Sequence, residues 1–195
     1  NKKNQISEFI QNYGIKDQKV LVELAKLSTE EDNKISKLIQ NYKIESEKDR
    51  IDLAKLAVQN DAVKTSEFIS NYKITDQDAL IEIAKHAVQK DGRVSIFINN
   101  YRIENEKERI GLAKLAAQNN GLICSMFINN YGITDQGSLT EIAHLSIRES
   151  IMSNTISEVW EYLPKYDISN KNIHLNRLQL LCACHYSLFV NEPSA

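Results

Sequence analysis

The sequence predicts an all-α protein, a superhelical solenoid of about five two-helix repeats with a degenerate capping repeat at its C-terminal end. The first observation behind this prediction is the dipeptide Asn-Tyr, which returns behind a Phe-Ile or Leu-Ile pair every 29 or 30 residues, at Tyr13, Tyr42, Tyr72, Tyr101 and Tyr131. The second is that apolar residues follow helical spacing and never settle into the alternation of a strand. A period of this length indicates a stack of similar supersecondary units rather than a globule around one site.

The repeats alternate between two flavours. After the tyrosine, the odd repeats carry Asp-Gln, as at residues 74–77, whereas the even repeats read Glu-Ser-Glu-Lys-Asp-Arg or a close variant, as at residues 45–50. The same flavour returns after 59 residues, which indicates duplication of a pair. We therefore divide the chain into five tandem repeats over residues 1–150 and a degenerate sixth repeat with a C-terminal cap over residues 151–195.

Each repeat is expected to begin with a short helix. In the first repeat Ile6, Phe9, Ile10 and Tyr13 have the i, i+3, i+4, i+7 spacing of one helical face. The helix should end at Asn-Tyr, followed by a residue in the left-handed conformation, which is glycine in two repeats and Lys or Arg in the others. These residues are Gly14, Lys43, Lys73, Arg102 and Gly132. The recurring asparagines should bond main-chain groups at this helix end.

A second helix of about 15 residues should follow in each repeat. It is predicted to open at Thr75 or Thr134 in odd repeats and at Ser46 or Asn105 in even ones. Its end is expected at Asn33, Gly92 and Gly121, with Ala62 as the exception. Apolar residues cover most of its circumference, so neighbouring repeats should pack on both sides of it.

The C-terminal part departs from the period. After Ser146 the chain carries about five extra residues, and residues 166–168 then echo the Tyr-x-Ile core of the repeats. We interpret this as a degenerate sixth repeat. The apolar helix expected over residues 175–188 would close the open end of the stack.

Composition excludes several classes of protein. Of the 195 residues, 42% are hydrophobic and 26% charged, and no segment approaches the roughly 18 apolar residues of a membrane span. A net charge of -2 makes nucleic acid an unlikely partner. Three cysteines without framework spacing indicate a reducing compartment and no disulfide. Because the chain starts without Met, close to its first repeat, we expect it to be a piece of a longer protein.

Two-helix units of this length resemble the α-solenoid group that includes HEAT, armadillo and tetratricopeptide repeats, although the period is shorter and their signature residues are not met. The phrase Phe-Ile-x-Asn-Tyr-x-Ile-x-Asp-Gln followed by Leu-x-Glu-Ile-Ala-Lys-x-Ala, best seen over residues 68–87, also resembles repeat-bearing effectors of intracellular bacteria. This resemblance covers roughly residues 6–150. It implies a bacterial protein, cytoplasmic or secreted into a host cell, that binds a host protein.

The first candidate site is a polar stripe along the second helices. Thirteen residues after each tyrosine stands a basic row, and ten residues after it an acidic row. The basic row is Lys26, Lys55, Lys85 and Lys114, with His144 in the fifth repeat, and the acidic row is Glu23, Asp52, Glu82 and Glu141. The stripe is either a partner-binding surface or a set of i,i+3 ion pairs that keep an exposed face solvated.

Ile96 and Met126 are the second candidate site. They stand five residues before the tyrosine, where the earlier repeats carry Glu8, Lys37 and Glu67. This position lies away from the apolar face of the short helix, so we expect two neighbouring exposed apolar groups that could contact a partner.

Arg50 and Arg109 occupy a position that is leucine in the odd repeats. A guanidinium against an apolar surface needs a compensating partner, and only odd repeats carry the aspartates Asp17, Asp76 and Asp135. We expect Arg–Asp pairs to lock unlike repeats together, in preference to a ligand contact.

Catalytic and cofactor chemistry find little support. Cys182 and Cys184 next to His185 suggest a metal, but residues two apart on a helix point about 200° from each other. No phosphate-binding loop is present, and we predict no cofactor. The expected function is a non-catalytic protein–protein interaction scaffold. The alternatives are a helical repeat that binds nucleic acid and the non-catalytic repeat region of a larger enzyme.

Overall fold

The computed structural model describes residues 5–31 and 35–166, and every element in those residues is a helix. The predicted all-α class is therefore confirmed for them. The elements are α1 Gln5–Phe9, η2 Ile10–Tyr13, α2 Gln18–Glu31, α3 Ile35–Leu38, η3 Ile39–Tyr42, α4 Glu47–Asn60, α5 Ala62–Glu67, η4 Ile69–Tyr72, α6 Gln77–Lys90, η5 Gly92–Ile96, η6 Ile98–Tyr101, α7 Glu106–Asn119, α8 Gly121–Met126, η7 Ile128–Tyr131, α9 Gln136–Met152, α10 Ile156–Tyr162 and η8 Leu163–Tyr166.

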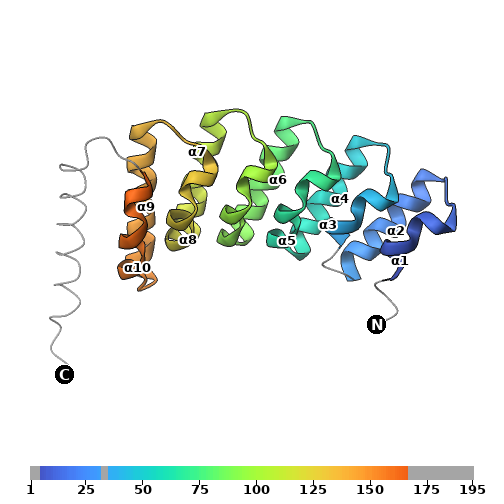
Figure 1. Ribbon diagram of the computed structural model, residues 1–195, viewed down its shortest axis with the longest axis horizontal. Coiled ribbons are helices and arrows are strands. Elements are labelled where there is room, and N and C mark those ends of the chain that lie inside the picture. The colour runs from blue at the N-terminus through green and yellow to red at the C-terminus, as the bar shows by residue number, and fades with distance from the viewer. Residues whose placement is uncertain (1–4, 32–34, 167–195) are drawn as a thin grey trace, which may run out of the picture.

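A short helical stretch is followed each time by a long helix, and the pairs lie side by side in a row (Figure 1). The long helices α2, α4, α6, α7 and α9 contact one another in that order. The 3₁₀ turns that end the short stretches also contact one another in order, from η2 through η3, η4, η6 and η7 to η8. Each helix pair therefore packs against the pair before it and the pair after it.

The predicted end of the short helix is confirmed in all five repeats. A 3₁₀ turn closes on the tyrosine, and the following residue is left-handed, with φ of 62°, 51°, 51°, 52° and 59° at Gly14, Lys43, Lys73, Arg102 and Gly132. Three of these are not glycine, although this conformation costs other residues roughly 1 kcal/mol or more. The packing between neighbouring pairs therefore holds the turn in a shape that local preference opposes.

The start of the long helix is as predicted in the even repeats and one residue later in the odd ones. Ser46 and Asn105 cap α4 and α7 by accepting bonds from the N–H groups of Asp49 and Lys107. In the odd repeats the cap is Asp76 or Asp135, not the preceding threonine. A carboxylate accepts the free N–H groups of the first turn and also favours the positive end of the helix dipole, so aspartate takes the capping place.

The predicted glycine stop at the end of the long helix is wrong. The helices end at Asn60, Lys90 and Asn119, and the next residue is extended and caps the following short stretch. Gly92 and Gly121 are thus the first residues of new helical turns. Their role is close approach, since a Cβ at Gly121 would collide with the backbone of Ser146. The buried Ala62 is the small residue at the same place, and Asn33 lies outside the described residues.

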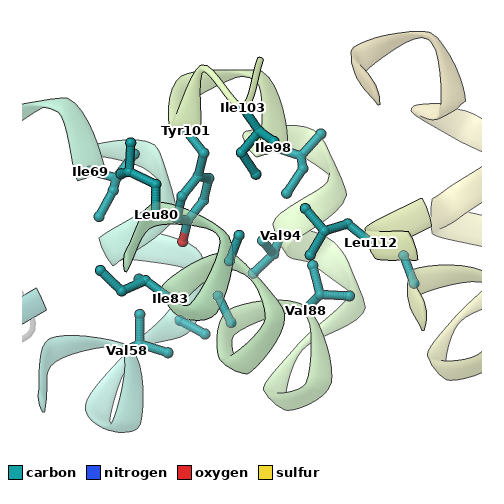
Figure 2. Close-up of a cluster of buried hydrophobic side chains, with 14 of the residues drawn as sticks. Val58, Ile69, Leu80, Ile83, Val88, Val94, Ile98, Tyr101, Ile103 and Leu112 are labelled. Carbon is teal, nitrogen blue, oxygen red and sulfur yellow. The ribbon is translucent and has the colours of Figure 1, made fainter. Parts of the chain in front are cut away.

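One apolar core runs through every pair from Ile10 to Tyr166. Figure 2 shows how the repeats share it: Tyr101 lies beside Ile69 and Leu80 of the preceding repeat, while Val88 reaches toward Leu112 of the following one. Tyr42, Tyr72, Tyr101, Tyr131 and Tyr166 are each at most 1% exposed. The core is therefore formed at the junctions between repeats as well as within each repeat.

The hydroxyl of each buried tyrosine shares a hydrogen bond with a serine of the preceding repeat. The pairs are Ser7–Tyr42, Ser36–Tyr72, Ser66–Tyr101, Ser95–Tyr131 and Ser125–Tyr166, with oxygen–oxygen distances of 2.8, 2.9, 2.8, 2.8 and 2.9 Å. All five serines are buried. We call these contacts the Ser–Tyr ladder.

The recurring asparagines act beside this ladder. The Nδ2 of Asn71, for example, donates to the carbonyls of Ser36 and Lys37, and that of Asn130 donates to Ser95 and Ile96. The predicted bonds to main-chain groups are confirmed, but the carbonyls belong to the preceding repeat. The asparagines therefore join repeats instead of closing their own helix.

After α9 the chain forms the short helix α10 and the 3₁₀ turn η8, which contacts η7 and α8. The extra residues extend α9 to 17 residues, and Tyr166 at the end of η8 is fully buried. Its hydroxyl bonds Ser125 and also Ser146. The predicted closing helix over residues 175–188 lies outside the described residues, as do Cys182, Cys184 and His185. Among the helices that are described, none has the length and apolar character needed to cross a membrane.

We predict that Tyr101→Phe lowers the free energy of unfolding by about 1 to 2 kcal/mol, because it removes a buried hydrogen bond between two repeats. Urea unfolding followed by circular dichroism measures this. Tyr13→Phe is the matched control, since Tyr13 is 63% exposed, and it should change stability by less than about 0.5 kcal/mol. Equal effects at the two positions would contradict the role assigned to the ladder.

Candidate functional site

The polar stripe predicted from the sequence lies on the exposed side of the long helices, and its lysines form ion pairs. The nitrogen–oxygen distances are 2.9 Å for Lys26–Glu23, 2.8 Å for Lys55–Glu82, 3.1 Å for Lys85–Glu108 and 2.7 Å for Lys114–Glu141. Only the first is an i,i+3 pair within one helix. The other three join one long helix to the next.

Small differences in sequence explain which carboxylate each lysine takes. Lys55 and Lys114 reach the glutamate ten residues after the tyrosine of the next repeat. In the fourth repeat that position is Gly111, so Lys85 pairs with Glu108 instead. In the second repeat it is Asp52, one methylene shorter than glutamate, and Lys26 turns to Glu23 in its own helix.

These ion pairs contribute little to the fold. Their side chains are about a third to two thirds exposed, and exposed pairs contribute about 0 to 1 kcal/mol each. Lys55 lowers the pKa of Glu82 through the hydrogen bond between them. The pairs hold charges of both signs in a fixed register along the row of helices, and His144 continues the basic row as an exposed residue.

An apolar row runs next to the lysines, one residue further along each long helix. It consists of Leu27, Leu56, Leu115 and Leu145, with His86 in the third repeat. Leu27 is 58% exposed, the other leucines are half-buried and His86 is exposed. This row was not predicted from the sequence. The leucines recur with the same 29- or 30-residue period as the tyrosines. Apolar residues that recur on a helix are usually core residues, so the period alone does not indicate a surface.

Two grooves between long helices contain residues of this surface. One, between α6 and α7, is lined in part by Ile81, Glu82, Lys85 and Glu108. The other, at α7 and α9, is lined by Gln118, Leu145, Arg148, Glu149, Met152 and Ser153, and Met152 is 81% exposed. We call the ion pairs, the leucine row and these grooves the long-helix face.

Ile96 and Met126 are half-buried, which corrects the expectation that they are exposed. Neighbouring short helices lie closely enough to cover part of each side chain, and the ammonium of Lys165 reaches the carbonyl of Met126. The long-helix face is therefore the better candidate surface of the two.

Arg50 and Arg109 join unlike repeats as predicted, but through carbonyl groups. Arg50 donates to the carbonyls of Ile44 and Glu45 in its own repeat and to that of Lys73 in the next, at 2.9, 2.6 and 3.4 Å. Arg109 makes the equivalent three bonds, the last to Gly132. The predicted pairing with Asp17, Asp76 and Asp135 is wrong, because those carboxylates accept N–H groups at the starts of their own helices.

A glutamate completes each junction from an even to an odd repeat. Glu47 accepts bonds from the N–H and hydroxyl of Thr75 and the N–H of Asp76, and these bonds lower its pKa. Glu106 does the same at the fourth repeat. Junctions from odd to even repeats use glutamine at this position: Gln77 accepts from the N–H of Glu104. The two flavours therefore differ in the groups that face the next repeat.

Chemistry other than binding has few candidate groups in the described part of the chain. No cluster of three or more His, Cys, Asp or Glu residues there could hold a metal ion. Cys124 is fully buried, and its burial raises the thiol pKa to about 12, so the reactive thiolate does not form near neutral pH.

Comparisons with protein-family models, with curated proteins and with solved structures found no match. Function is therefore inferred from the residues and contacts of this chain.

We predict that Arg50→Ala lowers the free energy of unfolding by about 1 to 3 kcal/mol, because three charge-assisted bonds to carbonyls are lost. Lys55→Ala removes one exposed ion pair and should cost less than about 1 kcal/mol. Chemical denaturation of both variants tests this difference. A cost at Lys55 equal to that at Arg50 would refute the assignment of one residue to the junction and the other to the surface.

Proposed function

We propose that the helix pairs form a superhelical α-solenoid of five repeats with a degenerate sixth repeat at the end, and that it is a non-catalytic scaffold that binds another protein. The observation that carries the proposal is the long-helix face. Four of the five long helices present a leucine beside charged residues, and the ion pairs among those charges contribute little to the stability of the fold. An apolar centre with a polar rim is the composition of protein-binding surfaces.

The arrangement of charges favours a protein partner over nucleic acid. Each lysine of the basic row is held within 3.1 Å of a carboxylate, so the row offers no excess positive charge to a phosphate backbone. A peptide or helix with charges of both signs and apolar side chains at intervals would match the surface. A host protein bound by a bacterial effector is the partner class that the sequence resemblance implies.

The test uses charge swaps, which keep every ion pair and reverse its direction. One variant combines Lys55→Glu with Glu82→Lys, Lys85→Glu with Glu108→Lys, and Lys114→Glu with Glu141→Lys. Because the pairs and the net charge are preserved, we expect the same thermal midpoint as the native chain within a few degrees. A second variant, Leu27→Ser with Met152→Ser, removes the two most exposed apolar side chains of the long-helix face.

Affinity capture from eukaryotic and bacterial lysates compares these variants with the native chain. We expect the native chain to retain a protein that the swapped variant loses, and the serine variant to retain less of it, with binding by the purified partner weakened at least tenfold in the swapped variant. Capture that neither variant changes would contradict the proposal that this face binds the partner. Retention of polynucleotide that weakens steeply with salt would favour a nucleic-acid-binding repeat instead.

A further inference from the structure

The first repeat exposes three apolar residues at positions that the later repeats bury or half-bury. Tyr13 is 63% exposed, whereas the tyrosines at the same position in the next four repeats are at most 1% exposed. Phe9 is 47% exposed, and its counterparts are half-buried. Val20 is 44% exposed, and Ala79 in the third repeat is 8% exposed. The N-terminal side of the first repeat is therefore an apolar face with the composition of an internal junction.

The polar groups of a junction are also in place on this face. Gly14 has the left-handed conformation, with φ of 62°, that sets the carbonyl which arginine reaches at Lys73 and Gly132. Asp17 accepts the N–H of Lys19 and so caps α2, in the way that Asp76 and Asp135 cap their helices. Asn12 is exposed, although the asparagines of later repeats donate to the repeat before them. The half of the junction that belongs to the first repeat is preformed.

Because the first repeat is of the odd type, its sequence specifies which type of helix pair can pack on this face. The first repeat is odd, and both odd repeats with a predecessor in the structure, the third and the fifth, follow an even one. At those two junctions the even repeat supplies a serine to the tyrosine, a glutamate to two N–H groups and an arginine to the left-handed residue's carbonyl. An odd repeat carries glutamine and leucine in place of the glutamate and arginine.

We propose that the N-terminal face of the first repeat is a binding surface for a helix pair of the even type, with serine, glutamate and arginine at the positions of Ser95, Glu106 and Arg109 in this chain. The occupant's serine bonds Tyr13, its glutamate accepts from the N–H groups of Lys16 and Asp17, and its arginine donates to the carbonyl of Gly14. A second copy of the chain does not meet this requirement, because its even repeats are packed between neighbours on both sides.

The test adds an even repeat to the full chain. A copy of residues 92–120 replaces Asn1 and Lys2, so that the copy of Asn120 precedes Lys3 as Asn120 precedes Gly121. A copy of residues 62–91, an odd repeat, is grafted in the same way as the matched control. A third graft carries the even copy with its arginine changed to leucine and its glutamate to glutamine. Each is made with Tyr13 and with Tyr13→Phe, and the nitration rate of Tyr13 by tetranitromethane is measured beside the urea midpoint.

We expect the even graft to slow nitration of Tyr13 at least tenfold and to make the urea midpoint sensitive to Tyr13→Phe. In the native chain we expect the same substitution to leave the midpoint nearly unchanged, because Tyr13 is exposed there. The odd graft and the substituted even graft should protect Tyr13 less. Nitration at the native rate in the even graft would overturn the proposal, even if the added residues do not fold. Equal protection by odd and even grafts would overturn the requirement for arginine and glutamate. A native chain that dimerises, and loses the dimer with Tyr13→Ala, would overturn it by identifying a second copy as the occupant.

Discussion

The hydrogen bond between a buried serine and the tyrosine of the next repeat is the interaction on which the rest of the structure depends. Each tyrosine brings its ring into the apolar core and its hydroxyl to a buried serine, so one side chain contributes apolar area and satisfies a polar group. A buried hydroxyl without a partner is costly, and only one spacing between neighbouring pairs satisfies both oxygens. The ladder therefore fixes the distance and register of successive repeats.

The alternation of two flavours follows from how each junction is completed. Where an even repeat meets an odd one, Arg50 or Arg109 and the neighbouring Glu47 or Glu106 reach across to main-chain groups. Where an odd repeat meets an even one, glutamine makes a single bond instead. Because each type of junction needs its own pair of partners, the chain extends by pairs, which agrees with the 59-residue period of the sequence. The charged residues that bond main-chain groups at the junctions are therefore different residues from those of the long-helix face.

The sequence predicted what depends on local order along the chain. The helical class, the end of each short helix at Asn-Tyr and the left-handed residue after it follow from spacing and turn preference, even where lysine or arginine replaces glycine. The errors concern lateral contacts. Asp76 was predicted to pair with Arg50 because a guanidinium against an apolar surface needs a compensating carboxylate. Its carboxylate instead accepts the N–H of Ala79 at the start of its own helix. Lys55 pairs with Glu82, 27 residues away, through a register between helices that no spacing within one helix specifies.

The serines of the ladder illustrate the same limit. Ser36, Ser66 and Ser95 recur with the same period as the tyrosines, so the signal was present in the sequence. A serine within a short helix gives no indication of which neighbour its hydroxyl meets, because that depends on how closely two repeats approach. The candidate surface was likewise recognised by its charges, while the leucines beside it were not predicted to belong to it. A repeat pattern alone does not distinguish exposed from buried positions. The exposure of these side chains follows from how the neighbouring helices pack.

A double-mutant cycle on Ser66→Ala and Tyr101→Phe tests the central claim most directly, because it isolates the bond between two repeats from the packing of each side chain. Urea unfolding of the two single variants and the double variant gives their coupling free energy. The ladder predicts a coupling of about 1 kcal/mol, and Ser95→Ala with Tyr101→Phe, two residues of one repeat that bond different partners, should be additive within about 0.5 kcal/mol. Additive effects of Ser66→Ala and Tyr101→Phe would contradict the account.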